Sequence, residues 1–167
     1  MKAASVHELK KELMALEPKE LAELCLRLAK FKKENKELLT FLMYEAHDVP
    51  AFLIELKKDI EKEFAEMNRD NLYLTKKSLR KILRITNKYI RYIGTKEAAA
   101  ELLIFFMSNI KKADIPIHKG AVMSNMYMAQ LKKINQLIDQ LDEDLQHDYR
   151  KELEEAKIEK PPFKLFG

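Results

Sequence analysis

Apolar and polar positions along the chain alternate with the spacing of α-helices. In residues 18–33, for example, Leu21, Leu24 and Leu28 recur every third or fourth position. This spacing places side chains on one face of a helix, whereas strands require a period of two. The pattern predicts seven helices, at about 5–16, 18–33, 35–47, 50–67, 75–93, 96–112 and 121–157.

Capping residues mark several ends of the predicted helices. Ser5 followed by Glu8 forms a capping box, in which each side chain satisfies a backbone N–H of the other residue. Thr75 is the expected N-cap of the fifth helix, and Gly94 suits the left-handed conformation that ends many helices. Thr95 then caps the sixth helix.

The distribution of apolar residues predicts which helices are buried. Segment 35–47 is apolar on most sides, so we expect it at the centre, and segment 96–112 also has the composition of a buried helix. An unbroken helix over 121–157 would be about 55 Å long. We therefore expect it to break near Asn135 or Asp142, or to project from the fold.

Five apolar residues in this last segment have coiled-coil spacing: Leu131, Ile134, Ile138, Leu141 and Leu145. Barely two heptads are too few for a stable coiled coil. We favour packing of this stripe onto the rest of the chain over a seam for a second copy.

The fold class predicted is all-α, with residues 1–159 as a single domain and residues 160–167 as an extended tail. Two arrangements agree with the pattern. One is an irregular antiparallel bundle, and the other is a short solenoid-like stack of helical repeats. The stack requires a duplicated three-helix unit.

A weak internal similarity bears on that choice. Residues 37–43 match residues 101–107 at five of seven positions, so 18–67 and 75–140 form a candidate pseudo-repeat. Helix-rich sequences also produce such matches by chance. The duplication is therefore a hypothesis.

Composition excludes several classes of protein. The chain is 47% hydrophobic and 35% charged, with only three glycines. Its longest apolar stretch, 98–107, is interrupted by Glu101, and a membrane span needs about 20 apolar residues. The single Cys25 cannot form an internal disulfide, which fits a reducing compartment. We expect a cytoplasmic protein.

Positive charge is concentrated in the middle of the chain. Residues 69–119 contain 12 basic and four acidic residues. Within predicted helix 75–93 there is no acidic residue, and the basic side chains occupy one arc of about 140°. These seven residues are the candidate site for an anionic partner: Lys76, Lys77, Arg80, Lys81, Arg84, Lys88 and Arg91.

Three partners could neutralise this basic face. The first is the chain's own acidic segment, 139–148, and the second is a nucleic-acid phosphate backbone, which lysine and arginine bind without reading bases. The third is an acidic protein or an anionic membrane surface, of which the membrane is the less favoured because the apolar side of the helix is expected in the core. Tyr73, Tyr89 and Tyr92 could stack on bases, although the last two lie on or near the apolar side.

Catalytic and metal-binding signatures are missing from the sequence. There is no glycine-rich phosphate loop or nucleophile elbow, and Asp144 with His147 gives only a single helical pair. Cys25 lies on an apolar stripe, where a thiol is usually inert. We expect no catalytic or metal site, no cofactor and no small-molecule substrate.

The sequence therefore favours a non-enzymatic helical scaffold that binds another macromolecule, either a protein partner or a second copy of itself. The alternative is a nucleic-acid-binding module that uses the basic face of helix 75–93.

Overall fold

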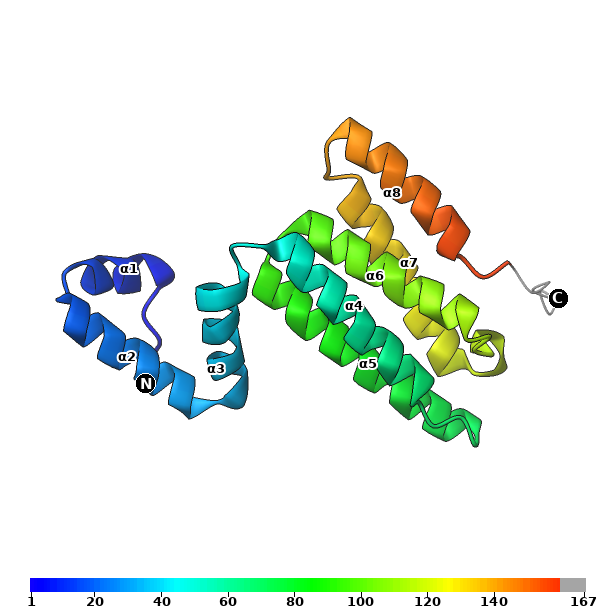
Figure 1. The fold of residues 1–167 in the computed structure, drawn as a ribbon, viewed down its shortest axis with the longest axis horizontal. Coiled ribbons are helices and arrows are strands. Elements are labelled where there is room, and N and C mark those ends of the chain that lie inside the picture. The colour runs from blue at the N-terminus through cyan, green and yellow to red at the C-terminus, as the bar shows by residue number, and fades with distance from the viewer. Residues whose placement is uncertain (160–167) are drawn as a thin grey trace. The chain divides into compact units, whose positions relative to one another are not determined.

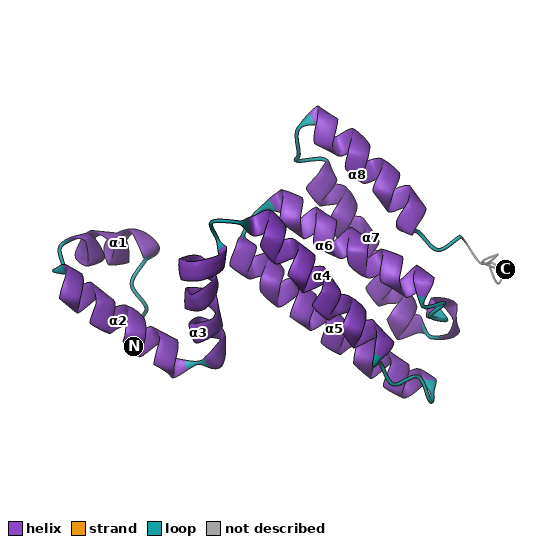
Figure 2. Ribbon diagram, in the orientation of Figure 1, coloured by secondary structure: helices purple, strands orange, loops and turns teal. Residues whose placement is uncertain are grey.

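The fold is all-α, as predicted, and the computed structural model describes residues 1–159 (Figure 1). Every regular element in this range is a helix, with no strand between residues 1 and 159 (Figure 2). Eight α-helices replace the seven predicted. The chain divides into two compact units, Met1–His47 and the residues from Asp48 onward. The predicted tail, 160–167, lies outside the described residues.

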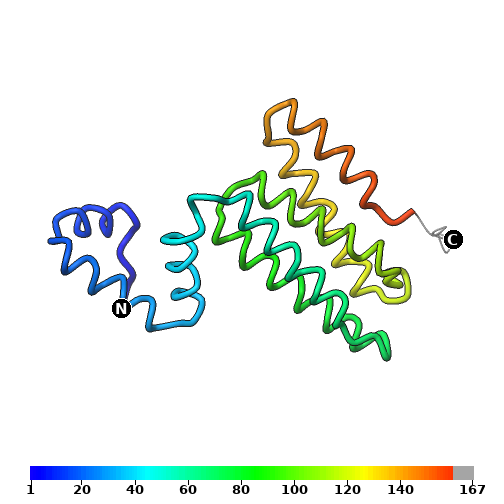
Figure 3. Tube along the Cα trace, in the orientation of Figure 1, coloured from blue at the N-terminus to red at the C-terminus, as the bar shows by residue number. Residues whose placement is uncertain are grey.

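The first unit consists of four consecutive helical segments (Figure 3). They are α1 (Val6–Met14), α2 (Pro18–Phe31), α3 (Lys33–Thr40) and the π-helical turn η1 (Phe41–Glu45). The predicted capping box begins α1: Ser5 N–H donates to Glu8 Oε2 at 2.7 Å, and Glu8 N–H donates to Ser5 Oγ at 3.3 Å. Helix α2 packs against α3.

The prediction that segment 35–47 lies at the centre was wrong. No residue of α3 is buried, and in η1 only Phe41 is buried, while Leu42 and Met43 are exposed. The segment also changes from α to π geometry, with Ala46 N–H donating to Phe41 O at 2.9 Å. Apolar residues on several sides show that a helix can be buried, but burial also requires enough neighbouring helices to surround it.

The second unit is built around a central helix. Its elements are α4 (Val49–Ala65), α5 (Leu72–Ile93), α6 (Lys96–Lys112), the 3₁₀ turn η2 (Ile117–Lys119), α7 (Ala121–Ile138) and α8 (Glu143–Ala156). Helix α6 packs against α4, α5, α7 and α8. Ten of its residues are buried, which confirms the predicted burial of this helix.

Two openings lie between the helices that surround α6. Helix α4 packs against α5, and α7 packs against α8, so they form two antiparallel hairpins (Figure 1). One opening lies between α4 and α8, and the other lies between α5 and α7. These openings are the two pockets considered below.

Helix α5 begins earlier than predicted. Its N-cap is Asn71, whose Oδ1 accepts from Leu74 N–H at 2.9 Å, and Thr75 instead lies buried inside the helix. Threonine can cap a helix, but asparagine is preferred over it, and a start at Asn71 adds one more turn to the helix. Gly94 ends α5 with a φ of 76°, and Thr95 caps α6, both as predicted.

The long C-terminal helical segment breaks at one of the two predicted places. Helix α7 ends at Ile138, and Asp142 is the extended N-cap of α8. Ile134, Ile138 and Leu141 are buried, so the apolar stripe packs within the unit as favoured above.

The candidate pseudo-repeat stays a prediction. Its first copy, 18–67, includes residues from both units, whereas 75–140 lies within the second. Within the described range, no helix is both long and apolar enough to cross a membrane.

Candidate functional site

Burial of one side of α5 turns its other side outward. Leu79, Ile82 and Thr86 are almost wholly buried where α5 packs against α4 and α6. The Thr86 hydroxyl donates to Ile82 O at 2.9 Å, so this polar group is satisfied inside the helix. Because residues on opposite sides of a helix cannot both face the core, the basic residues are directed to the surface.

The seven basic residues predicted as an anion site have three different environments. Lys81 forms an ion pair with Glu63 of α4, with Nζ and Oε2 2.7 Å apart. Four others are exposed and form no ion pair with any residue in the range 1–159: Lys77, Arg80, Arg84 and Arg91. We call these four the exposed cations of α5.

Lys76 and Lys88 are partly buried beside aromatic rings. Lys76 Nζ lies 5.2 Å from the centre of the Tyr73 ring, and Lys88 Nζ lies 4.7 Å from that of Tyr89 and 5.9 Å from that of Tyr92. These are cation–π distances. Of the three tyrosines considered for base stacking, only Tyr73 is exposed; Tyr89 is half-buried and Tyr92 is buried.

The charge of one basic residue of α5, Lys81, is neutralised by a carboxylate of α4. The acidic segment 139–148 follows α7 into α8, and α8 packs against α6 and α7. Within that segment Asp139 Oδ1 accepts from Arg150 Nη2 at 2.6 Å, an ion pair that joins the end of α7 to α8. Glu63 of α4, rather than the segment 139–148, is a carboxylate that pairs with the basic face.

An open groove of about 560 Å³ adjoins the exposed cations of α5. Its lining comes from α5 and α7. The α5 side consists of Arg80, Leu83, Arg84 and Asn87, and the α7 side consists of Val122, Asn125 and Met126. No carboxylate occurs in either helix, because residues 72–93 and 121–138 contain neither aspartate nor glutamate. The groove therefore presents guanidinium and amide groups together with apolar surface.

Asn87 connects the two sides of this groove. Its Nδ2 donates to Leu83 O at 3.0 Å, and its Oδ1 accepts from Lys133 Nζ of α7 at 3.0 Å. Lys133 is exposed and thereby extends the basic surface from α5 onto α7. Our sequence analysis missed Lys133, and the available signal was the lack of acidic residues throughout 121–138.

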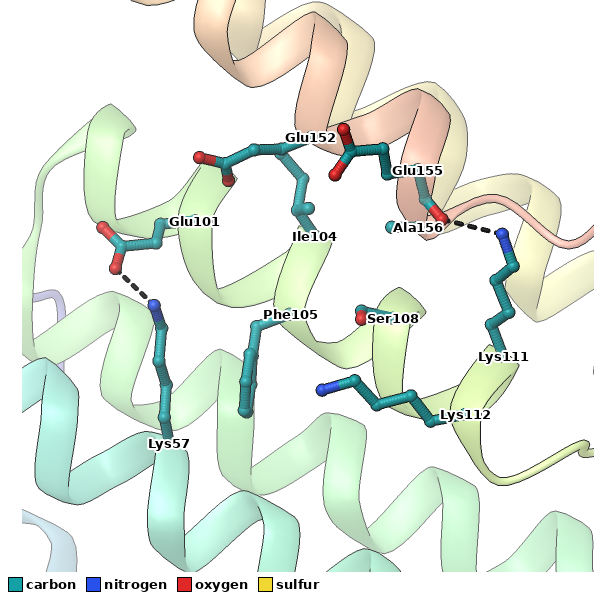
Figure 4. Close-up of a pocket in the computed structure, with 10 residues that line it drawn as sticks. All are labelled: Lys57, Glu101, Ile104, Phe105, Ser108, Lys111, Lys112, Glu152, Glu155 and Ala156. Atoms are coloured by element: carbon teal, nitrogen blue, oxygen red, sulfur yellow. Dashed lines mark hydrogen bonds and ion pairs between the residues drawn. The ribbon is translucent and has the colours of Figure 1, made fainter.

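A second pocket, of about 540 Å³, lies between α4 and α8 over α6 (Figure 4). Lys57 Nζ donates to Glu101 Oε1 at 2.6 Å, and Lys111 Nζ donates to Glu155 O at 2.8 Å. The Phe105 ring lies between two ammonium groups, 5.3 Å from Lys57 Nζ and 5.9 Å from Lys112 Nζ. Three lysines and three glutamates line this pocket, so its charges largely compensate one another.

Partial burial and neighbouring carboxylates raise the pKa values of two groups near this pocket. Partial burial of an otherwise exposed side chain, and next the negative charge of Glu101, raise the pKa of Glu152 above its ordinary value, against a smaller lowering effect of Lys57. Burial also raises the pKa of Tyr149 to about 12, with Glu101, Glu152 and Glu97 adding to the shift. Both shifts mean that the deprotonated, negatively charged form of each group is disfavoured here.

Comparisons with protein-family models, curated proteins and solved structures find no match to this chain. The site is therefore interpreted from its own chemistry. All four histidines are exposed. No three histidine, cysteine, aspartate or glutamate side chains in the described part of the chain are grouped so that they could hold a metal ion.

Proposed function

We propose that this protein is a non-enzymatic helical interaction module that binds an anionic macromolecule, with nucleic acid as the favoured partner. The binding surface comprises the exposed cations of α5, the groove between α5 and α7, and Lys133. The observation that carries the proposal is the lack of any carboxylate in both helices that form the groove, beside four unpaired cations.

The chemistry of the surface favours phosphate over other anions. Arginine presents several N–H donors in a planar arrangement that fits phosphate oxygens, and asparagine adds neutral donors. Protein interfaces usually centre on buried aromatic anchors. The groove supplies only Leu83, Val122 and Met126 as apolar contacts. An open, donor-lined groove is better suited to an extended phosphate backbone, contacted without reading bases.

The groove also lacks the groups that catalysis requires. Its side chains are arginine, asparagine, leucine, valine and methionine, none of which is an ordinary nucleophile or general base. This supports a binding role. Together with the single cysteine, the composition supports a location in the cytoplasm as part of the proposal.

The test is fluorescence anisotropy with labelled duplex DNA, single-stranded DNA and RNA over a range of salt concentrations. With five cations in contact, the logarithm of the binding constant should fall with the logarithm of salt concentration with a slope of about −4.5 for duplex DNA. The double variant Arg80→Gln, Arg84→Gln should reduce that slope by about 2, because each lost phosphate contact removes roughly 0.9.

The matched control removes two positive charges from another surface. Lys58 and Lys62 on α4 pair with Glu55 and Glu66, so Lys58→Gln with Lys62→Gln changes the net charge equally away from the groove. The control should retain most of the slope. An equal loss in both variants would assign binding to net charge rather than to this surface. Binding of polyglutamate without nucleic-acid binding would identify an acidic protein as the partner.

A further inference from the structure

The unit Met1–His47 buries little of its apolar surface. None of the residues of α1, α2 and α3 is buried. Units of this size rarely obtain enough stability from one core and usually need a disulfide, a metal or an associated chain. A disulfide within the chain is excluded because Cys25 is the single cysteine.

The largest exposed apolar feature of α2 is a regular stripe. Leu21, Leu24, Leu28 and Phe31 are all exposed, with Leu28 at 63% and Phe31 at 77%. Their spacing of three, four and three residues is that of a coiled-coil seam. Cys25 and Ala29, toward another side of the helix, are only partly exposed, whereas the exposed fraction along the stripe rises from 37% at Leu21 and 41% at Leu24 to 77% at Phe31.

The charges of α2 are divided between its two halves. Residues 17–23 contain three glutamates and one lysine, whereas residues 24–33 contain four basic residues and no acidic one. If two copies of α2 lie antiparallel, the acidic half of each helix lies beside the basic half of the other. A parallel pair would instead place like charges side by side.

We propose that α2 is a self-association helix, on which a second copy of this chain docks through its own α2 in antiparallel orientation. Leu21 would pack at the level of the partner's Phe31, and Leu24 at the level of the partner's Leu28. Such a pairing is isologous, with the same surface on both copies and a two-fold axis near residue 26. It goes beyond the proposed function, because it involves the other unit and a different partner.

Two charged residues border the same edge of the stripe. Glu20 directly precedes Leu21, and Arg27 directly precedes Leu28. In this register Glu20 lies at the level of the partner's Lys32, and Arg27 lies at the level of the partner's Cys25. The pairing therefore depends on both apolar burial and opposite charge.

Light scattering of the full chain at micromolar concentrations tests the proposal. The wild type should have about twice the mass of 19.7 kDa. Leu28→Glu should give the mass of one chain. Leu26→Glu is the matched control, since Leu26 is also exposed, at 54%, but lies off the stripe. A monomeric wild type, or a Leu28→Glu protein that remains dimeric with unchanged helicity, overturns the proposal.

Charge variants test the orientation. Lys30→Glu with Lys32→Glu should raise the dimer dissociation constant by about tenfold or more, and adding Glu20→Lys with Glu23→Lys should restore pairing. Because Glu20 accepts the capping hydrogen bond of Glu17 N–H, Glu20→Gln serves as the control for the cap. Failure of the double exchange to restore the dimer overturns the antiparallel orientation.

The single cysteine supplies an independent readout. Cys25 lies one residue from the proposed two-fold axis, so a short bismaleimide should link two chains through Cys25 alone. Cross-linking should disappear in Leu28→Glu and persist in Leu26→Glu. Equal cross-linking in these two variants counts against the proposal.

Discussion

The hydroxyl of Tyr127 accepts a hydrogen bond of 2.9 Å from the backbone N–H of Ile158. Tyr127 belongs to α7 and is buried, whereas Ile158 follows the end of α8 at Ala156. The bond therefore fixes the chain after α8 to the neighbouring helix. It also satisfies a polar group on a side chain that the core encloses.

Removing this hydroxyl should destabilise the second unit. Tyr127→Phe keeps the ring but leaves the Ile158 N–H without its partner, which should lower the free energy of unfolding by about 1 kcal/mol. Urea denaturation followed by circular dichroism measures the change. Tyr73→Phe, at a tyrosine that is 64% exposed, should have almost no effect. Equal losses in the two variants would mean that the hydrogen bond contributes nothing specific.

Replacing Gly94 by a residue with a side chain should lower the free energy of unfolding for a purely conformational reason. Its φ is 76°, and a Cβ added there would meet no atom within 4 Å. Gly94→Ala should therefore cost about 1 kcal/mol of unfolding free energy through backbone strain alone. Gly120 is the control because its φ of −155° is ordinary, so Gly120→Ser should change stability by only a few tenths of a kcal/mol. A neutral Gly94→Ala would contradict the left-handed cap.

Glu152 should make stability depend on pH in a defined direction. Because its pKa in the folded protein is raised above 4.5, the folded state binds its proton more tightly than the unfolded chain does. Its contribution to stability is present below pH 4.5 and is lost as pH rises through the folded pKa.

Glu152→Gln should therefore be more stable than the wild type near neutral pH, by less than about 0.5 kcal/mol since the side chain is largely exposed. The difference should vanish in acid, which paired urea denaturations at the two pH values will show. Glu61→Gln, at an exposed glutamate on α4, controls for the change in net charge. A gain that persists unchanged in acid would contradict the assigned cause.

Releasing Lys81 from Glu63 should strengthen binding to a polyanion. In Glu63→Gln the 2.7 Å ion pair is lost, so Lys81, which is already exposed, becomes a fifth unpaired cation on α5. The salt slope for duplex DNA should then steepen by about 0.9, equivalent to one more phosphate contact. Glu61→Gln removes the same charge without freeing a lysine of α5. Equal effects of the two variants would show that only net charge matters.

Local signals in the sequence were sufficient for most helix positions. The capping box at Ser5, the glycine at Gly94 and the cap at Thr95 all occur as predicted, because such signals depend on a few neighbouring residues. The predicted cap at Thr75 was wrong because Asn71, one turn earlier, is also a capping residue, and asparagine is preferred over threonine at that position. The predicted central position of segment 35–47 was wrong because burial depends on how many helices surround a segment, which its own residues do not specify.

The candidate site was predictable in part for the same reason. A basic arc on one helix follows from helical spacing, and the four exposed cations of α5 lie on it. The pairing of Lys81 with Glu63 and of Asn87 with Lys133 joins residues 18 and 46 positions apart. Such contacts depend on which helices become neighbours, and no local pattern specifies that.

The central place of α6 has a consequence for how the protein opens. Exchange of a backbone amide with solvent deuterium requires its hydrogen bond to break, and α6 is enclosed by α4, α5, α7 and α8. Amides of residues 98–110 should thus exchange only through global unfolding of the second unit. Those of α1 and α2, which have no buried side chain, should exchange orders of magnitude faster. One chain would then contain a second unit whose amides exchange slowly and an N-terminal unit whose amides exchange fast. Association through α2 should slow the exchange of the N-terminal amides.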